Sequence, residues 1–172
     1  MIFEKTSLAG LVVVKPARLE DSRGFFARSF CEREFTAAGL PDRFVQCNVS
    51  YNVRRGILRG MHFQAGEGKL VRCTRGRVFD VAIDLRRDSP TFRKWHGLEL
   101  SQDNHHAFYI PPGFAHGFQT LVDESEVFYQ MTDFFQPERA GGVRWNDPAF
   151  GVRWPLPNPE LSERDQGFAQ FE

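Results

Sequence analysis

Short β-type segments follow one another along most of this chain, separated by turn residues, and their spacing limits the possible folds more than any other feature. About eight such segments lie between Phe44 and Phe135. They are FVQCNVSYNV, GILRGMHF, KLVRCTRG, RVFDVAIDLR, KWHGLELS, HAFYIPPG, AHGFQTLV and EVFYQMTDFF. Many short strands with turns at even intervals are typical of antiparallel sandwiches and barrels. The sequence therefore predicts a mainly β fold.

The flanking segments predict a few further elements. GLVVVKPARL is expected to be a strand that ends near Pro16, and DSRGFFARSF a turn followed by an aromatic strand. Residues 31–40 contain helix-forming residues and a late glycine, so they predict a short helix. Residues 158–167 fit either one helical turn or a loop. Because no repeat or low-complexity linker interrupts the chain, we predict a single domain over residues 1–172.

The charge balance excludes several classes of function. Among 172 residues, 22 Lys and Arg offset 22 Asp and Glu. A net charge of zero argues against non-specific binding to nucleic acid or to a membrane surface. No apolar run approaches the roughly 20 residues that span a bilayer, and the first residues lack a secretory signal pattern. Three widely spaced cysteines, Cys31, Cys47 and Cys73, indicate reduced thiols in a cytoplasmic protein.

The segment of residues 77–86 shows the clearest two-residue alternation. One face is Phe79, Val81, Ile83 and Leu85, and the other is Val78, Asp80, Ala82 and Asp84. In the commoner arrangement the apolar face packs on the core and the aspartates face water. Alternatively, the aspartate face lines a polar cavity inside a barrel. Alternation alone is compatible with both.

The segment YIPPGFAHGFQTL places a tight Pro-Pro-Gly turn before a strand that carries His116. This turn-then-histidine pattern resembles the second motif of the cupin superfamily, whose members are small jelly-roll barrels. Many cupins bind a metal through three histidines and a glutamate. Here His62 stands alone at the place of the usual first pair, and His105 and His106 are adjacent, so they point to opposite faces of a strand. We therefore expect no metal site.

The polar residues of the predicted strands suit proton transfer. His62 and His116 can accept protons near neutral pH, and the phenol of Tyr129 can donate one where a carboxylate would already be ionised. Lys69 and Arg59 can stabilise negative charge that develops nearby. A base, an acid and cations together favour proton abstraction next to a carbonyl, through an enolate. Taken singly, each residue is more often structural.

A series of ordered motifs identifies a known family. The motifs are DSRGFF, LRGMHFQ, KLVRCTRGRVFDVAIDLRRDSPTF, IPPGFAHGF, VFYQMTDFF, GVRWNDPAFGVRWP and LSERDQ. From about Asp21 to Gln166 they resemble the dTDP-4-dehydrorhamnose 3,5-epimerases. The resemblance implies a cupin jelly-roll homodimer without metal or other cofactor. It also implies epimerisation of a 4-keto-6-deoxy-hexose on a nucleotide diphosphate, most simply a dTDP-linked one.

The resemblance assigns catalytic roles to four residues. His62 matches the family's base, Asp165 the carboxylate that orients it, Tyr129 the acid, and Lys69 the cation that faces the C4 oxygen. It also implies substrate-binding residues. These are Arg23 and Arg59 for the diphosphate, Gln46 and Asn48 for the nucleobase, Phe135 for stacking on that base, His116 as the second histidine of the pocket, and Arg164 next to Asp165.

Two questions remain open at the level of sequence. Arg59 and His62 have opposite parity in a straight strand, so both face one cavity only if a bulge near Gly60 turns them inward. The reaction also has alternatives, namely a relative that inverts only C3 or only C5, and a cupin that binds a sugar nucleotide without catalysis. The retained base, acid and lysine favour the double epimerase.

Overall fold

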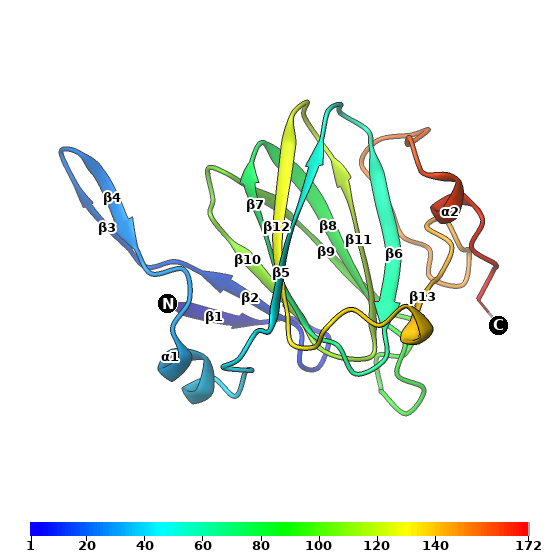
Figure 1. The fold of residues 1–172 in the computed structure, drawn as a ribbon, viewed down its shortest axis with the longest axis horizontal. Helices are drawn as coiled ribbons and strands as arrows, with labels where there is room; N and C mark the ends of the chain where they lie inside the picture. Colours follow the sequence, from blue (N-terminus) through cyan, green and yellow to red (C-terminus); the bar gives the residue numbers. More distant parts are fainter. Residues whose placement is uncertain (172) are drawn as a thin grey trace.

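The computed structural model describes residues 1–171, and most of its strands form two antiparallel sheets that face one another (Figure 1). The six-stranded sheet has the order β1-β2-β10-β7-β12-β5. Its strands are β1 (Ile2–Lys5), β2 (Val12–Lys15), β10 (Ala107–Ile110), β7 (Lys69–Arg75), β12 (Ser125–Met131) and β5 (Gln46–Asn52). The five-stranded sheet consists of β13 (Ala140–Gly142), β6 (Leu58–Gln64), β11 (Phe114–Thr120), β8 (Arg77–Asp84) and β9 (Trp95–Ser101). This arrangement confirms the predicted mainly β, jelly-roll class.

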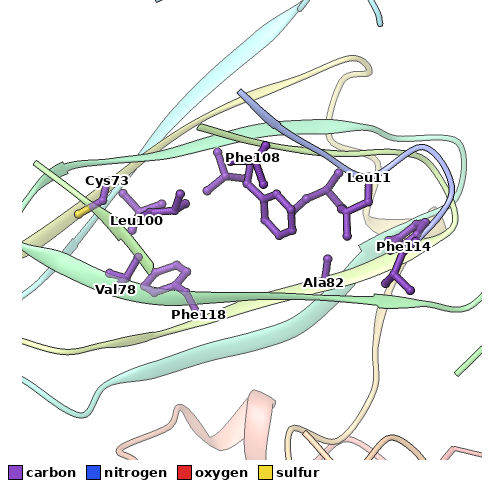
Figure 2. Packing of buried hydrophobic residues seen from close by; sticks show 13 residues of the cluster. Leu11, Cys73, Val78, Ala82, Leu100, Phe108, Phe114 and Phe118 are labelled. Atoms are coloured by element: carbon purple, nitrogen blue, oxygen red, sulfur yellow. The ribbon is translucent and has the colours of Figure 1, made fainter. Parts of the chain in front are cut away.

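The main core fills one part of the space between the two sheets. Figure 2 shows this cluster, with Phe108 of the six-stranded sheet near Val78, Ala82 and Phe118 of the five-stranded sheet. Burying a side chain of this size contributes about 1.5–3 kcal/mol, so the cluster is a major source of stability. Val71 and Val127 belong to it too. Apolar inner positions therefore occupy one end of β7 and β12 and leave their other end to polar side chains.

The alternating strand β8 is buried on both faces. Val81 and Ile83 pack against a second cluster that includes Val143 and Phe150 of the C-terminal segment. On the other face, Asp80 is completely buried between the sheets. The commoner arrangement, with the aspartates in water, is therefore wrong for this strand. Asp80 instead faces inward, as in the alternative arrangement. The apolar outer face of β8 is not left in water, because the C-terminal segment covers it.

Three smaller elements lie outside the sheets. Strands β3 (Arg18–Asp21) and β4 (Gly24–Ala27) form a hairpin that projects away from the sandwich near helix α1 (Glu32–Ala37) (Figure 1). The hairpin exposes large apolar side chains: Leu19 is 68% and Phe26 is 69% solvent-exposed. Helix α2 (Glu163–Gln166) lies beside β6 at the opposite end of the molecule, and the 3-10 turn η1 (Pro137–Arg139) precedes β13.

All eight segments predicted as strands between residues 44 and 135 contain strands, and the helix predicted in residues 31–40 is α1. The ambiguous segment 158–167 contains α2, so the helical alternative is right. Within the described part of the chain no helix is long and apolar enough to cross a membrane. The cysteines Cys31, Cys47 and Cys73 are all free thiols.

Candidate active site

A cavity of about 630 Å³ opens between the sheets beyond the main core. Its two walls come from different sheets. His62 and His116 line it from the five-stranded sheet, and Asn48, Lys69 and Tyr129 line it from the six-stranded sheet. Proton-transfer groups therefore lie on both walls of one cavity.

The imidazole of His62 is hydrogen-bonded to the buried carboxylate of Asp165. Its Nε2 lies 2.7 Å from Oδ1 of Asp165, and the other carboxylate oxygen accepts a hydrogen bond of 3.1 Å from the Gly60 backbone N–H. Burial opposes ionisation of Asp165, but the hydrogen bonds from His62 and Gly60 outweigh it and lower the pKa of Asp165. An ionised carboxylate only accepts hydrogen bonds, so the neutral imidazole carries its proton on Nε2 and keeps Nδ1 as its basic nitrogen.

Helix α2 positions Asp165 for this contact. The Ser162 hydroxyl accepts a hydrogen bond from the Asp165 backbone N–H and so begins the helix. Because α2 has a single turn and lies against β6, it presents Asp165 directly to the strand that carries His62. The arrangement is a histidine–carboxylate pair in which the carboxylate orients the imidazole.

A bulge in β6 resolves the parity problem of Arg59 and His62. Where β6 pairs with β11, His62 faces His116 and Arg59 faces Phe118, so β6 has one more residue than its partner. Gly60 allows this, because its φ is +147° and a Cβ there would lie only 2.7 Å from the Gly117 Cα. Both Arg59 and His62 consequently line the cavity.

His116 forms a second histidine–carboxylate pair. Its Nε2 lies 2.9 and 3.0 Å from the two oxygens of Asp80. Burial raises the pKa of Asp80, and the neighbouring His116 only partly offsets this effect. Asp80 is the inward-facing aspartate of β8, and its role as a partner of His116 was not predicted from the sequence.

Tyr129 on β12 is suited to donate a proton. Burial and the negative charge of Glu67 raise the pKa of Tyr129, while a hydrogen bond with Asn48 and the charge of Arg59 partly oppose that rise. The hydroxyl therefore stays protonated at neutral pH. It lies on the wall opposite to His62, because β12 and β6 belong to different sheets.

Lys69 stands at the start of β7 and forms an ion pair with Glu67. Both side chains line the cavity, and the Glu67 side chain is only 1% exposed. Sequence reasoning missed Glu67, since it lies in a segment, AGEG, that has the composition of an exposed loop. Its spacing of two residues from Lys69 was the available signal, because such residues share one face of an extended chain.

The residues predicted to bind the nucleotide lie along the same cavity. Gln46, Asn48, Phe135, Arg59 and Arg164 all line it. The Phe135 ring is half exposed, and its backbone N–H donates to the Gln46 side-chain oxygen over 3.1 Å, which ties the loop after β12 to β5. An exposed aromatic ring beside amide groups can stack on a planar base and hydrogen-bond its edge.

Every predicted site residue except Arg23 and Asp165 lines the cavity, and Asp165 contacts it through His62. Arg23 lies in the turn of the β3–β4 hairpin and pairs with Asp21. The hairpin projects away from the two sheets (Figure 1), and none of its residues lines the cavity between them. Among residues 1–171, no group of three or more His, Cys, Asp or Glu side chains is arranged to hold a metal ion.

Known proteins resemble this chain in sequence and in fold. The profile of the dTDP-4-dehydrorhamnose 3,5-epimerase family matches residues 5–172. The dTDP-4-dehydrorhamnose 3,5-epimerase of Methanothermobacter thermautotrophicus is 47% identical over 171 residues, which cover 96% of this chain and 92% of that protein.

Two solved structures have the same architecture. The epimerase of Elizabethkingia anophelis superimposes with a TM-score of 0.95 at 41% identity, over 99% of this chain and 96% of that one. The epimerase of Legionella pneumophila in complex with dTDP-4-keto-L-rhamnose has a TM-score of 0.89 at 40% identity, over 95% and 89%. This chain therefore belongs to the family of dTDP-4-dehydrorhamnose 3,5-epimerases, which are isomerases of cupin type.

Proposed function

We propose that this enzyme inverts C3 and C5 of dTDP-4-dehydro-6-deoxy-D-glucose to give dTDP-4-dehydro-L-rhamnose, with His62 as base and Tyr129 as acid. One observation carries the proposal: these two groups line the same cavity from opposite sheets. Inversion needs a proton to leave one face of a carbon and another to arrive on the other face. A sugar between the two sheets meets both requirements without any further group.

The first half of each inversion is proton removal. The C4 ketone acidifies the protons on C3 and C5, because the carbanion is delocalised onto the ketone oxygen as an enolate. His62 takes the proton on Nδ1 while Asp165 stabilises the imidazolium that forms. The Lys69 ammonium stabilises the negative oxygen at C4. The electron pair of the C–H bond forms the C=C bond of the enolate, and the π pair of the C4 carbonyl moves onto its oxygen.

The second half is proton return from the opposite wall. The Tyr129 hydroxyl gives its proton to the carbon, the enolate collapses to the ketone, and a phenolate remains. Proton exchange with solvent then restores Tyr129 and His62, so the net reaction changes only configuration. Repeating the sequence at the second carbon uses the same residues, after the sugar or its ring conformation adjusts.

The walls of the cavity also suit the nucleotide diphosphate. Arg59 and Arg164 are cations at the cavity, and guanidinium groups bind phosphate oxygens in a bidentate manner. Asn52 accepts a 2.7 Å hydrogen bond from Arg59 Nε, which holds the guanidinium in place. Phe135 offers a stacking surface for the base. The Legionella pneumophila relative, solved with dTDP-4-keto-L-rhamnose, supports a dTDP-linked sugar as the substrate.

A homodimer would explain the position of Arg23. Its hairpin exposes Leu19, Phe25 and Phe26, an apolar surface unsuited to water but suited to a second chain. In such a dimer Arg23 of one chain can reach the diphosphate in the cavity of the other. Three free cysteines also fit our proposal that the enzyme works in the cytoplasm, where thiols stay reduced.

The proposal is tested by incubating the enzyme with dTDP-4-dehydro-6-deoxy-D-glucose in deuterated water and following the sugar by proton NMR and mass spectrometry. A double epimerase places deuterium at both C3 and C5, with inversion at both. Deuterium at C3 alone would favour a 3-epimerase. Tight binding without exchange at either carbon would contradict catalysis altogether.

A further inference from the structure

Glu67 is a buried carboxylate in the wall of the cavity, in the connection between β6 and β7. The N–H and the carbonyl of its neighbour Gly68 are both hydrogen-bonded to Thr132, the residue after β12. The Gly68 N–H donates to the Thr132 hydroxyl over 2.8 Å, and the Gly68 carbonyl accepts from the Thr132 N–H over 3.0 Å. The Glu67 N–H itself donates to the Gln64 carbonyl over 3.2 Å. The backbone thus holds the carboxylate at a defined place.

A carboxylate buried to this degree is costly unless a positive group compensates its charge. The compensating group is the Lys69 ammonium. Among residues 1–171, Glu67 is the only carboxylate that lines the cavity, whereas Arg59, Lys69 and Arg164 line it as cations. Glu67 therefore supplies negative charge to a cavity that is otherwise built to receive an anion.

Tyr129 stands close to this pair on the neighbouring strand. In the pairing of β7 with β12, Lys69 is opposite Met131 and Val71 is opposite Tyr129. Lys69 and Tyr129 hence project from the same face of adjacent strands, at diagonal positions. We infer that Glu67 is a positioning residue of the epimerase: it holds the Lys69 ammonium for the C4 oxygen and places a negative charge beside the Tyr129 hydroxyl.

The inference rests on the proposed roles of Lys69 and Tyr129, and it gives Glu67 a distinct task. The cations of the cavity favour the phenolate form of Tyr129, which cannot donate a proton. The negative charge of Glu67 acts in the opposite direction: burial is the larger cause of the raised pKa of Tyr129, and Glu67 is the neighbouring group that adds to it. Apart from Glu67, the titratable groups that line the cavity from outside the sheet of Tyr129 are Arg59, His62, His116 and Arg164, and none of them carries negative charge.

The test is a spectrophotometric titration of tyrosinate in the resting protein, which requires no substrate. The variant is Glu67→Gln, which removes the charge at nearly constant shape, and the matched control is Glu138→Gln, the same change at an exposed site. Comparison with Tyr129→Phe identifies the signal of Tyr129 among the three tyrosines. We expect ionisation of Tyr129 to move to lower pH in Glu67→Gln and to stay unchanged in Glu138→Gln. An unchanged titration in folded Glu67→Gln would overturn the inference.

Turnover gives the second readout. The alkaline limb of kcat/KM should move to lower pH in Glu67→Gln, in the same direction as the titration. If Glu67→Gln does not fold, the test uses Glu67→Asp instead, because this variant keeps the negative charge and shortens the side chain by one methylene group. Its alkaline limb should stay at the wild-type position, while kcat falls about tenfold or more as Lys69 is displaced. Wild-type kcat in Glu67→Asp would overturn the positioning role.

These outcomes separate the inference from the proposed function. A wild-type enzyme that gives no deuterium exchange contradicts the epimerase proposal, whatever the titration shows. If the wild type is active but Glu67→Gln leaves the tyrosinate titration unchanged, only the inference is contradicted.

Discussion

The His62 imidazole and the Asp165 carboxylate lie 103 residues apart in the chain and 2.7 Å apart in space. Asp165 uses its two oxygens for two donors, His62 Nε2–H and the Gly60 N–H. An asparagine at this position has one acceptor oxygen and cannot serve both. If its oxygen accepts from Gly60, its amide donates to His62 and forces the tautomer that lacks a basic Nδ1.

Asp165→Asn should therefore lose most turnover. We expect kcat to fall by about 10²–10⁴-fold, the range of a general base. The measurement is steady-state epimerisation at neutral pH, with Asp88→Asn as a control at an exposed carboxylate. Turnover within a factor of about three of the wild type would exclude an orienting role for Asp165.

The same variant should change the acid stability of the enzyme. The pKa of Asp165 is lowered in the folded chain, so its stabilising effect is complete above the unfolded-state pKa of about 3.9. The effect is lost as the pH falls through the folded-state value. Urea unfolding should give a constant difference between wild type and Asp165→Asn near neutral pH and a shrinking one below about pH 4. A difference that grows on acidification would contradict this sign.

Because Lys69 forms an ion pair with Glu67, variants of this pair should show different effects on the free energy of unfolding and on turnover. Lys69→Met leaves the Glu67 carboxylate buried without a partner, which should cost about 3–5 kcal/mol of unfolding free energy. Lys69→Met/Glu67→Gln should recover most of this stability, yet remain about 10²–10³-fold slower than wild type. Lys15→Met breaks the exposed pair with Glu4 and should cost no more than about 1 kcal/mol. Recovered turnover in the double variant would exclude Lys69 from the chemistry.

The arginines should contribute to binding more than to chemistry, since the diphosphate is present in ground and transition states alike. Arg59→Ala and Arg23→Ala should each raise KM about 10–10²-fold with little change in kcat, as expected for a charged hydrogen bond. Arg87→Ala, an exposed arginine outside the cavity, is the control. A fall in kcat at constant KM would move these residues to the chemical step.

Arg23 permits a sharper experiment, because its proposed partner cavity belongs to the second chain. Co-expression of Arg23→Ala chains with His62→Asn chains should form mixed dimers. In these, the cavity with an intact His62 receives an intact Arg23, so a fraction of sites should regain wild-type KM. Mixed dimers that retain the raised KM would show that Arg23 does not act across the dimer.

The strands were predictable because their signals are local. Alternation in β8 and the Pro-Pro-Gly turn before β11 depend on neighbouring residues only. Three strands were not predicted. One is β3 (Arg18–Asp21), which directly follows the predicted end of a strand near Pro16. β13 has the sequence AGG and no β-forming side chain, and it is a strand only because its backbone pairs with β6. β1 is short and lies at the edge of its sheet, next to β2.

Most of the polar residues that line the cavity were predictable, but not all of their pairings. The resemblance named His62 and Asp165 together, although no local pattern links β6 with α2. Asp80 was missed because its partner His116 lies on the neighbouring strand, and Glu67 because its segment has the composition of an exposed loop. The bulge near Gly60 could be anticipated, because Arg59 and His62 have opposite parity and both were expected to face the cavity.

The central claim is that base and acid act from opposite walls, and Tyr129→Phe in deuterated water tests it most directly. Without the phenol, His62 should still exchange the C3 proton, so deuterium should enter with retained configuration while inversion falls by about 10²-fold or more. His62→Asn should lose exchange and inversion together, and His105→Asn, at an exposed position whose φ of 52° suits asparagine, should behave as wild type. Inversion at the wild-type rate in Tyr129→Phe, or exchange that survives in His62→Asn, would contradict the account.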